Sequence, residues 1–204
     1  MLLLVRHGET APNRRGQYLG RADVALTARG VAQAHALARA LPSPDVVVTS
    51  PLRRARMTAE VFDAPTTVDE RWIELDYGRL DQQPVGSLPR DVAERWRREP
   101  MFAPPGVETF AELAERVHPA CASLVDAAID SVVVVVTHVG PVKASLAWAL
   151  GVPLTIADRL FVEDAGVSRV DVIDGRPVVR WFNRLGAEPG ESTEEPRGRL
   201  APRR

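Results

Sequence analysis

The stretch that decides the fold opens the chain, at residues 2–10: Leu2-Leu3-Leu4-Val5-Arg6-His7-Gly8-Glu9-Thr10. Its first half is a continuous apolar run, which is typical of a strand buried on both faces. Polar residues follow the run at once, beginning with Arg6 and His7. The same order, β-branched residues and then polar ones, recurs at residues 46–50 and 132–138. The sequence therefore predicts three buried strands, each followed by candidate functional residues.

Helical patterns separate these strands. Apolar residues recur at helical spacing over residues 27–41, 52–62, 109–129 and 141–150. Near the end of the chain, residues 166–172 and 177–182 read as two strands joined by the hairpin turn Asp174-Gly175. We therefore expect an α/β protein of three layers, with a mostly parallel sheet covered by helices on both faces and an antiparallel edge hairpin near the C-terminus.

Two segments depart from this alternation. Residues 80–107 contain five prolines and a short helical stretch, so we expect a substrate-side loop or lid, with a merely structural excursion as the alternative. Residues 186–204 consist mainly of Gly, Pro, Glu and Arg and have almost nothing to bury, so we expect a disordered tail. Residues 1–185 are accordingly predicted to form one domain.

The composition excludes several classes of protein. A formal net charge of −1 over 204 residues argues against binding to nucleic acid through bulk electrostatics. No apolar segment approaches the roughly 18 residues that a membrane span needs. Cys121 is the single cysteine, so an intramolecular disulfide or a cysteine-rich metal site is excluded. We expect a cytoplasmic protein that has no membrane or nucleic-acid partner, and the sequence leaves a homodimer open.

The residues after the three strands suit one chemistry. In open parallel sheets the carboxyl ends of the strands border a common crevice, so histidines and arginines that are distant in sequence meet there. Arginine binds phosphate oxygens with two parallel hydrogen bonds, and helix N-termini also favour anions. A neutral imidazole in such a pocket can attack phosphorus covalently. Phosphoryl transfer depends chiefly on positioning and charge stabilisation, which this set supplies without a metal ion or cofactor.

Four segments resemble the motifs of the histidine phosphatase superfamily, which includes phosphoglycerate mutases and several phosphatases. The resemblance covers roughly residues 2–183. Its segments are Arg6-His7-Gly8-Glu9-Thr10-Ala11-Pro12-Asn13, Ser50-Pro51-Leu52-Arg53-Arg54-Ala55, Glu74-Leu75-Asp76-Tyr77-Gly78 and Thr137-His138.

The resemblance implies a role for each matched residue. His7 would form the phosphohistidine, and Glu74 would protonate the leaving oxygen and then activate the hydrolytic water. The remaining predicted site residues would bind the phosphoryl group or the substrate. They are Arg6, Asn13, Gly20, Arg54, His138 and Val139.

The chain also departs from the family pattern beside the pocket. It has Leu80-Asp81-Gln82 where the family often shows Trp-Glu-Gly, and Gly106-Val107-Glu108-Thr109 where Gly-Gly-Glu-Ser is common. Val139 replaces a common glycine after the second histidine. None of these changes removes a proposed catalytic side chain, so they bear on the shape of the substrate.

The function predicted is that of a histidine acid phosphatase-type hydrolase: a metal-independent phosphomonoesterase that acts on a small soluble phosphate ester. A phosphoglycerate mutase is the alternative, although mutases of this family usually have Ser or Thr where this chain has Leu19. A catalytically inactive phosphate-binding module is an alternative of another class. The intact set of His7, Arg54, Glu74 and His138 argues against it, because an inactive module needs no proton donor.

Overall fold

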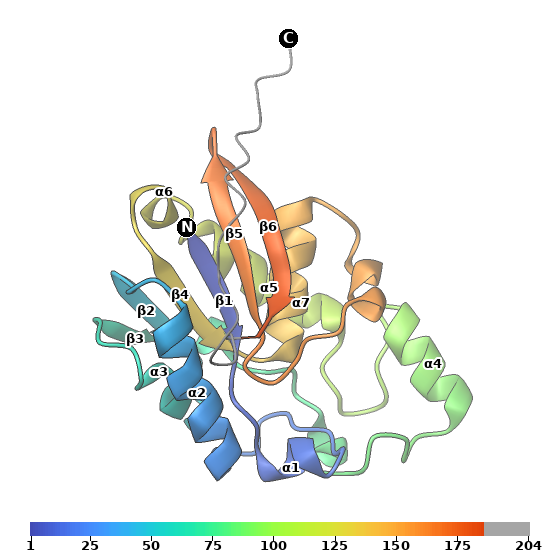
Figure 1. The fold of residues 1–204 in the computed structure, drawn as a ribbon. Coiled ribbons are helices and arrows are strands. Elements are labelled where there is room, and N and C mark those ends of the chain that lie inside the picture. The colour runs from blue at the N-terminus through green and yellow to red at the C-terminus, as the bar shows by residue number, and fades with distance from the viewer. Residues whose placement is uncertain (186–204) are drawn as a thin grey trace.

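Six strands form one mixed sheet in the order β3-β2-β4-β1-β5-β6 (Figure 1). In this computed structural model, which describes residues 1–185, β4 pairs in parallel with both β1 and β2, and β2 pairs in parallel with β3. β5 runs antiparallel to β1 and forms an edge hairpin with β6. The strands are β1 (Leu2–Arg6), β2 (Val46–Thr49), β3 (Thr66–Val68), β4 (Val133–Thr137), β5 (Val167–Ile173) and β6 (Arg176–Arg184).

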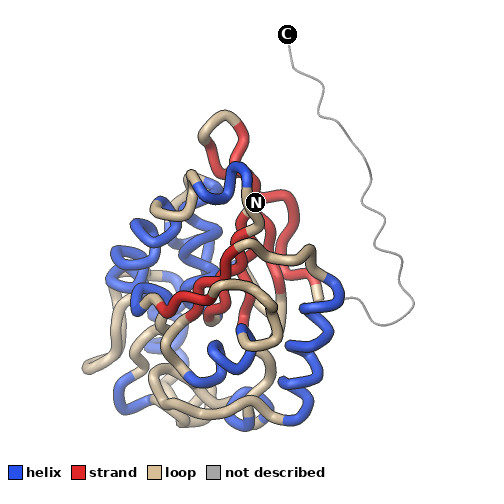
Figure 2. Tube along the Cα trace, turned by 90° about the vertical axis from the view of Figure 1, so that its left-hand side faces the viewer, coloured by secondary structure: helices blue, strands red, loops and turns tan. Residues whose placement is uncertain are grey.

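Helices cover both faces of the sheet, so that the strands lie between two helical layers (Figure 2). Leu3 and Val5 of β1 belong to a core cluster with residues of α2 and α3, whereas Leu2 and Leu4 join a second cluster with residues of α5 and α7. The three-layer α/β prediction is confirmed. The α-helices are α1 (Ala11–Arg14), α2 (Ala28–Ala40), α3 (Arg53–Ala59), α4 (Arg90–Arg98), α5 (Phe110–Ala122), α6 (Ala127–Asp130) and α7 (Val139–Leu150), and the 3-10 helices are η1 (Glu70–Trp72), η2 (Gly78–Leu80) and η3 (Leu154–Arg159).

Local sequence signals explain some of these boundaries. The Thr27 side chain accepts a hydrogen bond from the Gly30 N–H and so caps α2. At the terminal hairpin, Asp174 and Gly175 have φ angles of 51° and 73°, the positive values that a two-residue type I′ turn requires, and the predicted hairpin is confirmed.

Two local predictions were wrong or incomplete. The single helix expected over residues 109–129 is interrupted after Ala122, where the Ser123 hydroxyl donates to the Ala120 carbonyl and competes with the helical pattern. The edge strand β3 was not anticipated, because its three residues are exposed and lack the apolar pattern of a buried strand. The tail predicted to be disordered lies outside the described residues.

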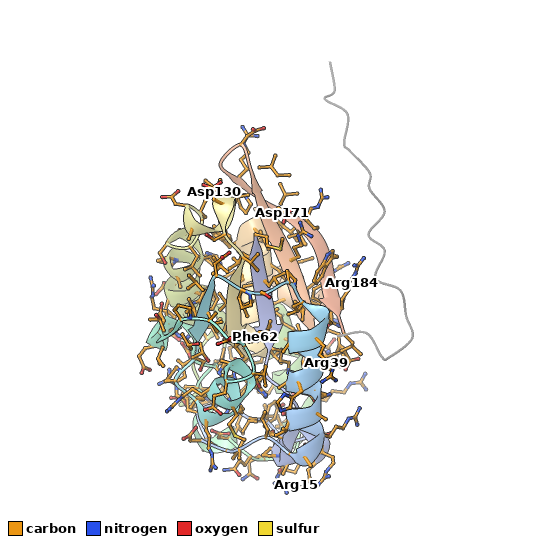
Figure 3. The ribbon with its side chains drawn as sticks, turned by 60° about the vertical axis from the view of Figure 1, so that its left-hand side comes forward. Arg15, Arg39, Phe62, Asp130, Asp171 and Arg184 are labelled. Atoms are coloured by element: carbon orange, nitrogen blue, oxygen red, sulfur yellow. The ribbon has the colours of Figure 1, made fainter. Side chains whose placement is uncertain are left out.

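The carboxyl ends of β1, β2 and β4 lie at the same edge of the sheet, since Arg6 pairs with Thr137 and Thr49 pairs with Val136. The loops and short helices beneath this edge include α1 and α4 (Figure 1). Arg15, just after α1, lies at this end of the molecule, and Asp130 and Asp171 lie at the opposite end (Figure 3).

The segment 80–107 begins at the end of η2 and contains α4 as its one α-helix. Its first residues are tied to the loop after α1. The Tyr18 N–H donates to the Gln83 carbonyl at 2.9 Å, and the Val85 N–H donates to the Gly16 carbonyl at 2.8 Å. None of the helices within residues 1–185 has the length and apolar character of a membrane span.

Candidate active site

His7 directly follows β1, and its side chain is only 3% exposed. Its Nδ1 atom lies 2.7 Å from the Gly8 carbonyl oxygen, which can only accept, so Nδ1 carries the proton. The lone pair therefore sits on Nε2, which accepts a hydrogen bond from Arg54 Nε at 3.1 Å. Burial, Arg54 and Arg6 lower the pKa of His7 well below its ordinary value. His7 is thus a neutral imidazole with its nucleophilic nitrogen facing a guanidinium.

Arg54 lies in the first turn of α3 and is fully buried. Besides the bond to His7, Nη1 donates to the Ala22 carbonyl at 2.8 Å and Nη2 donates to the Gly20 carbonyl at 2.6 Å. A guanidinium has five N–H donors, so each terminal nitrogen keeps one for an incoming anion. Burial lowers the pKa of Arg54 to about 10, which leaves the group charged at neutral pH.

Asp81 holds the loop that carries Gly20 and Ala22. Its two carboxylate oxygens accept the Gly20 N–H at 3.0 Å and the Ala22 N–H at 2.8 Å. Gly20 therefore has no free N–H for a ligand in this structure, and it contacts the site through its carbonyl bond to Arg54. Sequence reasoning connected Asp81 with substrate shape and missed this role, because only the fold brings residues 20–22 beside residue 81.

Arg6, the last residue of β1, is held by the segment before β5. Its Nη1 donates to the Val162 carbonyl at 2.6 Å, and its Nη2 lies 2.5 Å from Asp164 Oδ1. The Arg6 Nε atom is buried and has no hydrogen-bond partner among the described residues. No motif or spacing in the sequence indicates Asp164 as the partner of Arg6.

Asn13 caps α1 from within the helix, since its Oδ1 accepts the Thr10 N–H at 3.1 Å and the Thr10 hydroxyl at 2.6 Å. Its side-chain amide keeps two donors. A contact between Asn13 and the substrate stays a prediction.

His138 occupies the N-cap position of α7 and is fully buried. Its ring lies edge-on to that of His7, with the ring centroids 5.1 Å apart. Its Nε2 atom lies 2.7 Å from the Ser50 hydroxyl oxygen. Burial and the nearby Arg54 lower its pKa well below the ordinary value, so this imidazole is also neutral near pH 7. Val139, the next residue, packs against the apolar core, and its predicted contact with substrate stays a prediction.

Glu74 approaches the pocket from the loop after η1 and is 3% exposed. Its Oε1 accepts the Leu75 N–H at 2.8 Å and the Gly140 N–H at 3.1 Å. A Cβ atom at position 140 would collide with Glu74 Oε1, so the close approach requires glycine there. Burial raises the pKa of Glu74, although the Leu75 N–H, Arg54 and the Gly140 N–H oppose the shift. The shift increases the fraction of Glu74 that can donate a proton.

His7, Arg54, His138 and Glu74 thus form a buried cluster beside the ends of β1, β2 and β4, and the Arg54 guanidinium gives this cluster a positive charge. Direct contacts link His7 to Arg54 and place the ring of His138 against that of His7, while Gly140 connects the first turn of α7 to Glu74. Within residues 1–185, no group of three or more His, Cys, Asp or Glu side chains is arranged to hold a metal ion. The arrangement can bind a phosphoryl group, attack it through nitrogen and protonate a leaving oxygen.

The curated proteins that are similar to this chain include probable phosphoglycerate mutases of Salmonella. "Probable phosphoglycerate mutase GpmB" of Salmonella paratyphi C (strain RKS4594) is 34% identical over 180 residues, which cover 82% of this chain and 83% of the relative. The homologous protein of Salmonella choleraesuis (strain SC-B67) is 33% identical over 179 residues, with the same coverage.

Solved structures with the same fold include several phosphatases. Phosphoserine phosphatase from Entamoeba histolytica, in complex with 3-phosphoglyceric acid, has a TM-score of 0.82 and 25% identity, covering 90% of this chain and 96% of its own. Alpha-ribazole phosphatase from Shigella flexneri has a TM-score of 0.79 and 28% identity, covering 92% and 98%. Mycobacterial glucosyl-3-phosphoglycerate phosphatase, in complex with VO3, has a TM-score of 0.81 and 28% identity, covering 89% and 98%.

The family comparison covers nearly all of the described chain. The model of the histidine phosphatase superfamily (branch 1) matches residues 2–185, a range that contains all four motifs and every residue of the pocket. The chain belongs to the histidine phosphatase superfamily, branch 1, a family of phosphatases and mutases.

Proposed function

We propose that this protein is a metal-independent phosphomonoesterase that hydrolyses a small soluble phosphate ester through a phosphohistidine at His7. One observation carries the proposal: His7 is buried and neutral, its Nδ1–H is tied to Gly8, and its Nε2 lone pair faces Arg54. A phosphoryl group bound by Arg54 would lie against that lone pair. Positioning of this kind supplies much of the catalysis in phosphoryl transfer.

In the first step, His7 Nε2 attacks phosphorus and the bond from phosphorus to the ester oxygen breaks. Glu74 transfers its proton to the departing oxygen, which leaves as an alcohol. The N–P bond gives the His7 ring a positive charge, and the hydrogen bond from Nδ1–H to the Gly8 carbonyl stabilises that charge. Arg6, Arg54 and His138 bind the equatorial oxygens, where negative charge is spread.

In the second step, a water molecule attacks phosphorus in line with the N–P bond. Glu74, now a carboxylate, takes a proton from the water, and the N–P bond breaks to give inorganic phosphate and neutral His7. The cycle thus returns Glu74 to its protonated form. Phosphate release vacates the Arg54 donors and restores the resting site.

The proposed substrate class is supported by the names of the structural relatives. Phosphoserine, α-ribazole phosphate and glucosyl-3-phosphoglycerate are all small polar phosphomonoesters. A panel of such esters, with nucleotides and phosphoglycerates added, is the direct way to rank substrates for this chain.

The test is to trap the covalent intermediate. The enzyme is mixed briefly with a phosphate ester that carries radioactive phosphorus, quenched in alkali, which preserves phosphohistidine, and mapped by peptide analysis. Label on His7, its absence in His7→Ala and turnover that survives EDTA are the expected results. Label on Ser50 or Thr10, or activity that EDTA abolishes and a divalent ion restores, would refute the proposal.

A phosphoglycerate mutase is the second candidate, and the 34% identity to proteins with that name favours it. The two functions differ in where the phosphoryl group goes. A phosphatase passes it to water and needs no bisphosphoglycerate for priming, so it releases inorganic phosphate from a generic aryl ester. Rapid interconversion of the two monophosphoglycerates with little phosphate release would instead establish the mutase. Failure of the wild-type protein to catalyse either reaction would favour the inactive binding module.

A further inference from the structure

The contact between His138 and Ser50 has a consequence for the proton on the His138 ring. The Ser50 hydroxyl is fully buried, and its oxygen lies 2.7 Å from His138 Nε2 and 3.3 Å from the Leu52 backbone nitrogen. The other ring nitrogen of His138, Nδ1, is buried and has no hydrogen-bond partner among the described residues. A neutral imidazole has one donor and one acceptor nitrogen, so the partner of Nε2 decides what Nδ1 offers.

The hydrogen bonds around Ser50 select one arrangement. The Leu52 N–H can only donate, so the Ser50 oxygen accepts from it. Within residues 1–185, His138 Nε2 is the one acceptor that contacts the Ser50 hydroxyl. The hydroxyl therefore donates its proton to His138 Nε2. His138 Nε2 is the acceptor in this arrangement, and its proton resides on Nδ1.

We propose that Ser50 is a positioning residue that holds His138 in the tautomer with the proton on Nδ1, so that Nδ1–H is the donor for a phosphoryl oxygen. The inference rests on the proposed function, in which His138 binds the phosphoryl group. The opposite tautomer would present a bare lone pair from Nδ1 to an anion and would leave the Ser50 proton without an acceptor. In the proposed tautomer, the buried donor that has no partner within residues 1–185 is His138 Nδ1–H. Leaving such a donor unpaired costs about 1–3 kcal/mol, and a phosphoryl oxygen that accepts its hydrogen bond would remove this cost.

His7 and His138 would then carry the same tautomer for opposite purposes. In His7, the Gly8 carbonyl binds Nδ1–H and exposes the Nε2 lone pair as a nucleophile. In His138, Ser50 binds the Nε2 lone pair and leaves Nδ1–H as a donor. The partner of each ring, rather than its pKa, separates the two roles, because burial lowers the pKa of both.

The test compares Ser50→Ala with Thr49→Val, which removes a neighbouring buried hydroxyl that donates to the Ser50 carbonyl and does not contact His138. Long-range ¹H–¹⁵N correlation spectra of the free enzymes identify the protonated nitrogen of His138, and the chain's four histidines can be assigned by single substitutions. Affinity for inorganic phosphate and kcat/KM for an aryl phosphate complete the set. Wild type and Thr49→Val should show Nδ1–H, whereas Ser50→Ala should shift His138 towards Nε2–H.

With that shift, we expect phosphate affinity and kcat/KM of Ser50→Ala to fall roughly tenfold, the scale of one lost hydrogen bond to a charged group. Ser50→Thr keeps the hydroxyl and should retain both phosphate affinity and kcat/KM. Ser50→Cys has a weaker donor and should be intermediate. The cysteine variant replaces the alanine variant if the latter does not fold. An Nε2–H tautomer in wild type, or Ser50→Ala with unchanged tautomer and phosphate affinity, overturns the inference. If no phosphohistidine forms in the wild type, the proposed function is overturned. The tautomer is measured in the free enzyme, so the two failures can be distinguished.

Discussion

The buried cluster at the strand ends and helix α4 lie at the same end of the molecule but are built differently. In the cluster, His7, Arg54, Glu74 and His138 are each at most 3% exposed, and backbone groups fix most of their polar atoms. Helix α4 has no buried residue, and three ion pairs on or beside it join exposed or half-exposed side chains. Exposed pairs of this kind contribute about 0–1 kcal/mol each.

The difference indicates that the buried residues serve the chemistry and that α4 serves substrate preference. Chemistry that is common to the family needs fixed atoms, which buried strand ends and helix N-termini supply. A surface element held by weak contacts is free to vary with the substrate, and elements that move are drawn from the least stable parts of a fold. We therefore expect substitutions in the pocket to change rates by orders of magnitude and substitutions in α4 to change substrate preference modestly.

The largest effect that we predict in the comparison is at Glu74. Glu74→Gln should slow phosphoenzyme formation from an alkyl phosphate by roughly 10²–10⁴, the usual contribution of general acid catalysis. An aryl phosphate with an acidic phenol should be affected much less, because its oxygen leaves without a proton. Rapid quench on the first step makes the measurement, since water activation in the second step also uses Glu74.

The control is Glu9→Gln, because Glu9 is the other carboxylate that is buried within residues 1–185. Its Oε1 accepts the Thr27 hydroxyl at 2.7 Å. Glu9→Gln should not discriminate between the two esters. Equal slowing of both esters in Glu74→Gln would show that Glu74 is not the leaving-group acid, and discrimination in Glu9→Gln would assign that role to Glu9.

The pH profile provides a second measurement on the same variant. His7 must be unprotonated, so activity falls as pH drops through its lowered pKa. Glu74 must be protonated, so the alkyl ester reacts more slowly as pH rises through the raised pKa of Glu74. We expect Glu74→Gln to lose the alkaline limb of kcat/KM for the alkyl ester and keep the acid limb. An alkaline limb that survives the substitution would assign it to another group.

The next effect concerns the backbone that positions Glu74. In Gly140→Ala the new methyl group would collide with Glu74 Oε1 and would lie 2.9 Å from Leu113 Cδ1. Displacement of a catalytic group by about 1 Å can cost roughly 10²-fold in rate, so the alkyl ester should react about that much more slowly. Combining the change with Glu74→Gln should add little, because both remove the same proton donor. Fully additive losses in the double variant would contradict this account.

A substitution at Asp81 tests whether the first residues of the segment 80–107 support the binding of phosphate by Arg54. It lies within residues 80–107, yet its carboxylate accepts the backbone N–H groups of Gly20 and Ala22, whose carbonyls bind Arg54. Asp81→Asn would place an amide NH₂ against one of these donors and lower phosphate affinity by about tenfold, as expected for a disrupted bond to a charged group. Asp45→Asn is the control, because the Asp45 carboxylate also accepts a backbone N–H, that of Val132 at 2.7 Å, and within the described residues it makes no hydrogen bond or ion pair with residues 20–22. Equal effects of the two substitutions would remove Asp81 from the pocket's support.

The same boundary separates what the sequence could predict from what it could not. The buried strands, the flanking helices and the terminal hairpin follow from local patterns, because a doubly buried strand needs a continuous apolar run and a tight turn needs Asp-Gly. The strand-end rule and the motif resemblance likewise indicated His7, Arg54 and His138 as site residues. Asp81 and Ser50 carry no local signal for their partners, since each contacts a residue more than 50 positions away. Such pairings are visible only once the loops are packed.

The smallest predicted effect is at Trp96, the residue through which α4 meets the loop beside the pocket. Its ring lies 5.7 Å from that of Tyr18 and 5.8 Å from that of Tyr77, centroid to centroid. An aromatic pair contributes about 0.5–1.5 kcal/mol beyond its buried area, so losing both should loosen α4 without disturbing the strand ends. Trp96→Ala should therefore raise KM for the preferred ester by roughly threefold, with affinity for inorganic phosphate unchanged and Trp96→Phe close to wild type. A large fall in phosphate affinity would mean that α4 supports the pocket itself, and the proposed division of labour would then be wrong.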